Sequence, residues 1–262
     1  MEGIGAGPFV RWPSAWVGRR LVNMALRIAV RTSDDRQQRL VRRRNPEVGR
    51  DPAFDYLETR PAQLTRLPEL DRRGVEHLLQ GTAGRLLVGV NLRPIRHLYT
   101  VGAAGQDRAQ YTRVIESRFE QRFAEGLRQF ARAAAGQPCF IFFPMNAIQF
   151  GLSDLRSAYR IQRLLGNDVA LRIWESDASL EGVVALLRRL DIVIAMRFHA
   201  TIFALAQGRP VIGIDYRIGT RDKVAALLSD VGQSRNCSRI DDMSADWLCE
   251  RLSTLAKLPQ VG

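Results

Sequence analysis

The chain has 262 residues, 46% of them hydrophobic, which is enough to bury the core of one large or two modest domains. It contains no apolar run of the roughly 18 to 20 residues that a membrane span requires, and its N-terminus lacks the basic-then-apolar pattern of a signal peptide, so we expect a cytoplasmic protein. Three widely spaced cysteines without a CxxC pair, Cys139, Cys237 and Cys249, indicate neither a disulfide framework nor a zinc site.

The formal net charge of +12 at pH 7 is typical of proteins that bind nucleic acid or an anionic membrane surface. However, Lys223 and Lys257 are the only lysines among the 39 basic residues, and a GC-rich coding sequence accounts for such a bias towards arginine. Several arginines, among them Arg118, Arg122 and Arg128, fall in helices whose other faces are apolar, so we expect them to be solvated. The charge therefore argues against nucleic acid as a partner. It is compatible with a phosphorylated substrate, or with peripheral association with anionic lipid at the inner face of the plasma membrane.

The first 80 residues predict about two strands, which is half a domain at best. In chain order we expect a helix at about 14–26, a strand at 27–31, a capped helix at 33–43, a turn at 50–54 followed by a polar, proline-containing segment to about 68, and a helix at about 69–80. The glycine-dense start at residues 3–9 is not a dinucleotide-binding loop, because no strand precedes it and the G-x-G-x-x-G spacing is absent.

From residue 85 onward strands and helices alternate. We expect strands at about 86–93, 140–145, 169–174, 192–196 and 211–215, and helices at about 108–135, 153–165, 179–190, 199–208 and 244–258. After Tyr216, a loop that carries Arg217, Arg221 and Lys223 leads into a further helix that ends near Gly232. Five strands alternating with helices predict a complete α/β domain with a doubly wound parallel sheet.

The stretch from Asp191 to Tyr216 forms the central βαβ unit of this pattern. Its first strand is a short run of uncharged β-branched and small residues, as expected of a strand buried on both faces of a parallel sheet. Arg197 and His199 come directly after this strand, at the start of a helix. Because ligands bind outside the carboxyl ends of the strands in such sheets, and a helix N-terminus adds partial positive charge, we expect an anion site there.

Arg93 also follows a buried strand, so we expect it at the same edge of the sheet as Arg197 and His199. Two arginines suit a small anion with two or three charges, and a histidine beside them can donate a proton at neutral pH. Each residue also has a structural alternative. An arginine at a strand end can be a salt-bridge partner or helix cap, and a histidine at a helix start can be a capping or packing residue. The sequence contains no metal-binding box, Ser-His-Asp order or P-loop.

The run DIVIAMRFHATIFALAQGRPVIGIDY, at residues 191–216, resembles the polysaccharide pyruvyl transferase family, whose hallmark is Arg-x-His after a buried strand, then a helix and G-x-P-V-I. Further segments resemble the family's motifs in the family's order. They are residues 2–9 (Q-G-I-G-P), 30–34 (V-R-D-x-x-S), 50–54 (D-P-A-F) and 89–93 (a strand that ends in arginine).

This resemblance implies a GT-B-like α/β fold with the active site in the cleft between two Rossmann-like domains. It implies transfer of a pyruvyl group from phosphoenolpyruvate to two hydroxyls of one sugar, with a glycan or lipid-linked oligosaccharide as acceptor and no metal or cofactor. Arg93 and Arg197 would hold the carboxylate and phosphate of the donor, and His199 would be the general acid. The family has a lysine shortly after the strand that ends here at Tyr216, and Lys223 is the residue that can take its place.

The resemblance also predicts how the chain is divided. Family members open with a glycine-rich N-x-G-D loop on the first strand, and we expect this chain to start past that loop. Residues 1–82 would then be a partial N-terminal Rossmann-like domain, and residues 83–262 the complete C-terminal one, which carries the donor site.

Two other functions remain open. One is a GT-B glycosyltransferase that uses a nucleotide sugar, although the last βα units lack an obvious ribose-binding glutamate. The other is a non-catalytic remnant that keeps one Rossmann-like half. Such a remnant would expose apolar surface where the other half packs, and a homo-oligomer is then expected.

Overall fold

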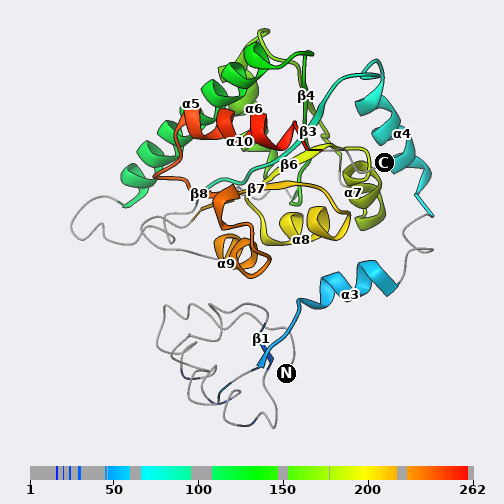
Figure 1. Cartoon of the computed structure of the whole chain (residues 1–262), viewed down its shortest axis with the longest axis vertical. Coiled ribbons are helices and arrows are strands. Elements are labelled where there is room, and N and C mark those ends of the chain that lie inside the picture. The colour runs from blue at the N-terminus through cyan, green and yellow to red at the C-terminus, as the bar shows by residue number, and fades with distance from the viewer. Residues whose placement is uncertain are drawn as a thin grey trace.

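The computed structural model describes residues 29–30, 45, 47–59, 66–95, 108–146, 153–176, 178–216 and 223–258, together with the single positions 16, 20 and 24 (Figure 1). Those three positions are helical, in agreement with the predicted helix at 14–26. The glycine-dense start and the predicted helix at 33–43 lie outside the described residues. The predicted strand at 27–31 is confirmed as β1 (Ala29–Val30), which pairs in parallel with β2 (Glu47–Val48) in a small sheet of its own.

The large sheet is parallel throughout the described residues and has the order β5-β4-β3-β6-β7-β8. Its strands are β3 (Leu87–Asn91), β4 (Cys139–Phe142), β5 (Leu171–Ile173), β6 (Ile192–Ala195), β7 (Val211–Asp215) and β8 (Cys237–Arg239). Numbered from its first strand, this is the 3-2-1-4-5-6 order of a Rossmann sheet, in which the winding reverses between the first and fourth strands. The predicted doubly wound domain is confirmed, and its switch point lies between β3 and β6.

Helices cover both faces of this sheet (Figure 1). One face packs against α5 (Arg108–Ala133), α6 (Leu155–Leu165) and α10 (Ala245–Leu255). The other packs against α3 (Pro52–Thr59), α4 (Glu69–Leu79), α7 (Leu180–Leu187), α8 (Phe198–Ala206) and α9 (Lys223–Asp230). The central strands β3, β4, β6 and β7 are buried along their whole length, which explains why their sequences are nearly continuous apolar runs.

The prediction of five strands was wrong by one, because β8 was missed. Its sequence, Cys-Ser-Arg, is short and polar, and all three residues are only partly buried since the strand lies at the end of the sheet order. The backbone of β8 pairs with β7 from Gly213 opposite Cys237 to Asp215 opposite Arg239. Pairing of this kind depends on the neighbouring strand and leaves no apolar periodicity in the sequence.

The expected turn at 50–54 is also wrong, because Pro52 begins helix α3. Asp51 accepts a hydrogen bond from the backbone N–H of Ala53 through Oδ1 at 3.0 Å, and proline is favoured at the first position of a helix. Phe54 and Leu57 of this helix are buried in the same core as α8. The Asp-Pro pair is therefore a helix start.

Candidate functional site

The candidate site lies at the carboxyl edge of the large sheet, around the switch point. Asn91 is the last residue of β3, and Arg93 follows it two positions later. Arg197 follows β6, which is the neighbour of β3, and Tyr216 follows β7, which is the neighbour of β6. The parallel direction of these strands places their carboxyl ends at one edge, so the predicted grouping of Arg93 with Arg197 and His199 follows from the topology.

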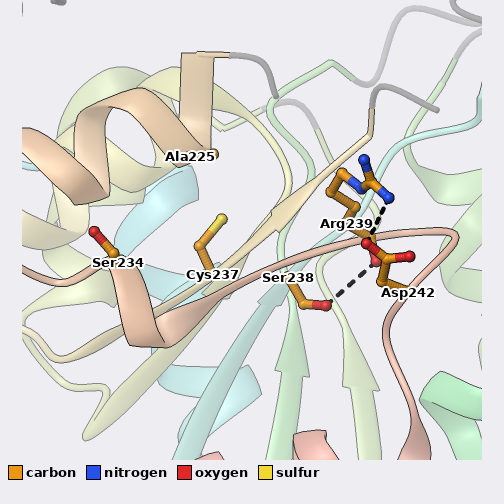
Figure 2. Close-up of a pocket in the computed structure, with 6 residues that line it drawn as sticks. All are labelled: Ala225, Ser234, Cys237, Ser238, Arg239 and Asp242. Atoms are coloured by element: carbon orange, nitrogen blue, oxygen red, sulfur yellow. Dashed lines mark hydrogen bonds and ion pairs between the residues drawn. The ribbon is translucent and has the colours of Figure 1, made fainter. Parts of the chain in front are cut away.

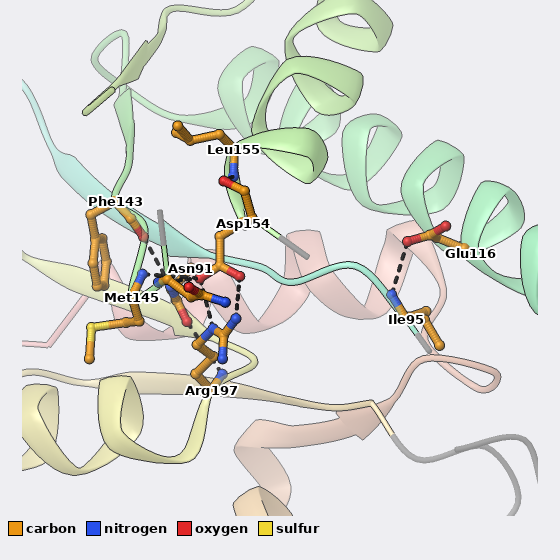
Figure 3. A network of polar contacts seen from close by, with 10 residues as sticks. Asn91, Ile95, Glu116, Phe143, Met145, Asp154, Leu155 and Arg197 are labelled. Carbon is orange, nitrogen blue, oxygen red and sulfur yellow. Dashed lines mark hydrogen bonds and ion pairs between the residues drawn. The ribbon is translucent and has the colours of Figure 1, made fainter. Parts of the chain in front are cut away.

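Arg197 forms a bidentate ion pair with Asp154, at the start of α6 (Figure 3). Its Nε donates to Oδ2 of Asp154 at 2.7 Å, and its Nη2 donates to Oδ1 at 2.6 Å. The side chain of Asp154 is fully buried, whereas that of Arg197 is 20% exposed. The Nη1 edge of the guanidinium takes no part in this pair.

An aspartate just before a helix is an ordinary N-cap signal, but the side chain of Asp154 does not cap α6. The residue occupies the N-cap position without a capping hydrogen bond from its side chain. Instead, Oδ2 accepts hydrogen bonds from the backbone N–H groups of Met145 at 3.0 Å and Asn146 at 3.2 Å, just after β4. The carboxylate therefore joins the end of β4 to Arg197. Sequence reasoning missed this residue as part of the site.

Asn91 holds Arg197 from the β3 side. Its side-chain amide donates to the carbonyl oxygen of Phe143 at 2.9 Å, and its Oδ1 accepts a hydrogen bond from the backbone N–H of Arg197 at 3.3 Å. Its backbone carbonyl accepts from the N–H of Met196 at 2.8 Å. Figure 3 shows Asn91 and Asp154 converging on Arg197 from different elements. A fully buried amide is stable in the sheet only when it is paired in this way.

Arg93 packs against an aromatic ring. Its guanidinium carbon lies 4.7 Å from the ring centroid of Tyr216. Since β6 lies between β3 and β7 in the sheet, this contact passes over the end of β6. The stacking fixes the plane of a partly exposed arginine.

His199 is the second residue of α8 and is exposed. Its ring lies 5.7 Å from the ring of Phe198 and 6.1 Å from that of Phe203, measured between centroids. Arg197 is the N-cap residue of the same helix, with an extended backbone at φ −91° and ψ 136°. An arginine and an imidazole thus share one helix N-terminus, where the backbone dipoles favour negative charge.

Lys223 is the first residue of α9 and is partly exposed. It follows β7, and residues 217–222, which join the two elements, are outside the described part. All four predicted residues therefore come after β3, β6 or β7, which are neighbouring strands. Among the contacts of these residues are the ion pair of Arg197 with Asp154 and the stacking of Arg93 on Tyr216.

Two hollows in the described surface lie away from these residues. One, of about 350 Å³, lies beside β8 and is lined by Ala225, Ser234, Cys237, Ser238, Arg239 and Asp242 (Figure 2). Across it, Nη2 of Arg239 pairs with Asp242 at 2.6 Å. The other, of about 290 Å³, includes Arg85, Pro138 and Ala170, which precede β3, β4 and β5 at the amino edge of the sheet. Neither is lined by the predicted donor-binding residues, so shape alone does not locate the site.

Within the described ranges, no three His, Cys, Asp or Glu side chains are arranged to hold a metal ion. The three cysteines are free thiols, buried at Cys139 and partly buried at Cys237 and Cys249. None of the helices that the structure describes combines the length and the apolar character needed to cross a membrane.

The fold and the charged switch point define an α/β protein of the GT-B-like class. The structure is similar to UDP-GlcNAc 2-epimerase from Neisseria meningitidis, with a TM-score of 0.58, 13% identity, and coverage of 98% of this chain and 61% of that one. It is also similar to a UDP-forming trehalose-phosphate synthase from Burkholderia xenovorans, with a TM-score of 0.51, 16% identity, and coverage of 97% and 59%. The chain thus spans about three fifths of the length of these proteins.

The family model of the polysaccharide pyruvyl transferases matches residues 3–217, and the chain belongs to this family. The matched segment contains Arg93, Arg197 and His199, together with Asn91 and Asp154, and it ends before Lys223. Comparison with curated proteins gives no match.

Proposed function

We propose that this chain is a pyruvyltransferase that transfers a pyruvyl group from phosphoenolpyruvate to a sugar of a cell-surface polysaccharide or its lipid-linked precursor. The products would be a pyruvate ketal and inorganic phosphate. The observation that carries the proposal is the pair Arg197 and His199, at the helix N-terminus beside the switch point and within the segment matched by the family model. A strongly anionic donor fits a site built from arginines and helix N-termini.

In this proposal Arg93, Arg197 and Lys223 bind the carboxylate and phosphate of phosphoenolpyruvate. Arg197 contributes through Nη1, because Asp154 occupies Nε and Nη2. Asp154 offsets the charge of Arg197, and the N-terminus of α8 adds partial positive charge that favours the anionic donor. The stacking of Arg93 on Tyr216 orients a guanidinium for bidentate binding of an oxyanion.

His199 is the proposed general acid. Its exposure leaves the imidazole accessible to a bound donor. Protonation of the enol methylene by His199 makes C2 electrophilic, and one sugar hydroxyl adds there. A second hydroxyl of the same sugar then displaces phosphate and closes the ketal. One hydroxyl proton replaces the proton that His199 gave up, and the other leaves with phosphate, so the reaction needs no net acid or base.

The domain division into residues 1–82 and 83–262 stays part of this proposal. The small β1–β2 sheet is separate from the six-stranded sheet, which supports a distinct N-terminal unit. Helices α3 and α4, although they precede residue 83, pack into the core of the large sheet. We further propose that the protein acts in the cytoplasm at the inner face of the plasma membrane, where lipid-linked acceptors are available.

The proposal is tested by incubating the protein with phosphoenolpyruvate and candidate glycans. Acceptor-dependent release of phosphate, with a ketal detected by mass spectrometry, is the expected result. His199→Ala should abolish this release, and unchanged activity in that variant would contradict the role of His199. Transfer from a nucleotide sugar in the absence of phosphoenolpyruvate would instead establish a glycosyltransferase.

A further inference from the structure

We infer that Asp154 is a positioning residue, which orients the guanidinium of Arg197 so that its Nη1 edge faces the donor. The kinetic part of this inference rests on the proposed function. Asp154 itself cannot touch a ligand, since its side chain is fully buried, whereas Arg197 is 20% exposed. Of the proposed donor-binding residues, Arg197 forms the bidentate pair with Asp154.

The burial of Asp154 supports a role beyond stability. A carboxylate buried in a protein core carries a desolvation penalty of several kcal/mol, and apolar residues of similar volume often replace a buried ion pair without loss of stability. Here the carboxylate accepts four N–H donors, from the backbones of Met145 and Asn146 and from Nε and Nη2 of Arg197. These donors come from the end of β4 and the end of β6, beside the switch point. A packing role does not require such an arrangement.

The geometry of the pair selects one edge of the guanidinium. A bidentate fork fixes both the position and the plane of the arginine. On the other side, Oδ1 of Asn91 holds the backbone N–H of Arg197, so the residue is restrained at its main chain from β3 and at its side chain from α6. Because the main chain and the side chain of Arg197 are both held in place, binding of the donor to Nη1 does not cost the rotamer entropy that an unrestrained arginine would lose.

The variant Asp154→Asn tests the inference because it keeps the size of the side chain and removes its charge. An asparagine presents only one acceptor to the two donors of Arg197, and its NH₂ group opposes the guanidinium. The KM for phosphoenolpyruvate is expected to rise about 10- to 100-fold, with a smaller change in kcat, because a binding group is misplaced while the general acid is untouched. A lysine at position 197 has a single ammonium group and cannot form the bidentate pair. In an Arg197→Lys background the same substitution should therefore change KM by less than about twofold.

Asp191→Asn is the matched control. Asp191 also accepts a backbone hydrogen bond, from Leu87 at 2.7 Å, but it does so at the amino ends of β3 and β6. Its substitution should leave the KM for phosphoenolpyruvate unchanged. If Asp154→Asn raises KM in the Arg197→Lys background as much as it does in the wild type, Asp154 does not act through Arg197 and the inference is overturned. An unchanged KM in the single Asp154→Asn variant would overturn it as well.

A spectroscopic readout separates this inference from the proposed function. The Nε–H signal of Arg197 in a ¹H–¹⁵N spectrum is identified by its absence in Arg197→Lys. In the wild type and in Asp191→Asn it should be shifted from the free-arginine position and exchange slowly. In Asp154→Asn it should return to the free position. If the protein releases no phosphate from phosphoenolpyruvate but the signal behaves in this way, the proposed function fails and the positioning contact stands.

The wild-type spectrum keeps the inference testable if Asp154→Asn does not fold. A fast-exchanging Nε–H of Arg197 at the free-arginine position in the wild type would overturn the inference outright. A second variant, Asp154→Glu, keeps the charge but displaces the carboxylate by one methylene, and it should also raise the KM for phosphoenolpyruvate. A wild-type KM in that variant would contradict an orientation that depends on the fork geometry.

Discussion

The guanidinium carbon of Arg93 lies 4.7 Å from the ring centroid of Tyr216, so the ends of β3 and β7 are in contact across the end of β6. This stacking orients one of the two arginines proposed to bind the donor, and Asp154 orients the other. The two arginines are thus fixed in different ways, one by an aromatic face and one by a carboxylate. The charge of Arg197 is offset by this carboxylate, which lowers the attraction of Arg197 for an anion.

Tyr216→Ala should therefore weaken donor binding. Loss of the ring removes a cation–π contact of about 0.5–2 kcal/mol and frees the side chain of Arg93, so the KM for phosphoenolpyruvate should rise several-fold. Tyr216→Phe, which keeps the ring, is the control and should bind the donor as the wild type does. Steady-state kinetics with varied phosphoenolpyruvate give both values. Equal KM values for the alanine and phenylalanine variants would show that the stacking has no role in binding.

His199→Asn should act on the chemical step. General acid catalysis by a positioned side chain typically contributes about 10²- to 10⁴-fold, so kcat should fall within that range while the KM for phosphoenolpyruvate changes little. Because His199 is exposed on the first turn of α8, the melting temperature should stay close to that of the wild type. A large drop in melting temperature with kcat retained would indicate that the histidine serves packing against Phe198 and Phe203.

The ends of the buried strands could be predicted from the sequence, and with them the positions of Arg93, Arg197 and His199. Arg93 and Arg197 directly follow uncharged runs, His199 comes two residues after Arg197, and parallel strands carry their carboxyl ends to one edge. The pairing of Asp154 with Arg197 could not be predicted in this way. An aspartate before a helix is an ordinary N-cap signal, whereas the partner of this one is 43 residues away, between β6 and α8.

An element that forms only because of its neighbour in the sheet could not be predicted from the periodicity of the sequence either. Strand β8 has three partly buried residues and exists because β7 offers a free edge to it. Helix α3 is different, because its start signal is local. Asp51 and Pro52 were interpreted as a turn, but an aspartate followed by proline is also the signal of a helix N-cap and first residue. Local signals of this kind can be recognised in a sequence, whereas edge pairing requires the strand order.

Gly126→Ala should destabilise the contact between α5 and α10. A Cβ atom at this glycine would lie 2.9 Å from the carbonyl oxygen of Ala245 and 3.0 Å from Cβ of Leu248, so α10 would have to move away. Overpacking of this kind costs about 1–3 kcal/mol of unfolding free energy, which urea denaturation can measure. Gly136→Ala is the control, because a Cβ there meets nothing within 4 Å. Equal stability of the two variants would mean that the two helices adjust freely.

Glu120→Gln should change the dependence of stability on pH. Glu120 is nearly buried between α5 and α6, where its carboxylate accepts a hydrogen bond from Nε of Arg160 at 2.9 Å. The pKa of Glu120 is raised from 4.5 to about 7, chiefly by burial; Arg160 opposes this rise and Glu116 adds to it. The folded chain therefore holds this proton more tightly than the unfolded chain does.

Stability from Glu120 is thus greatest below about pH 4.5 and is lost as the pH rises through about 7. A glutamine loses no proton, so the unfolding free energy of Glu120→Gln should increase relative to the wild type between pH 5 and pH 8, by on the order of 1–2 kcal/mol. Urea denaturation at both pH values measures this change, and Glu125→Gln, which removes a more exposed carboxylate from α5, is the control. Loss of the hydrogen bond to Arg160 adds an offset that is independent of pH. A difference between variant and wild type that is the same at both pH values would therefore show that Glu120 is already ionised at pH 5, with Arg160 prevailing over burial.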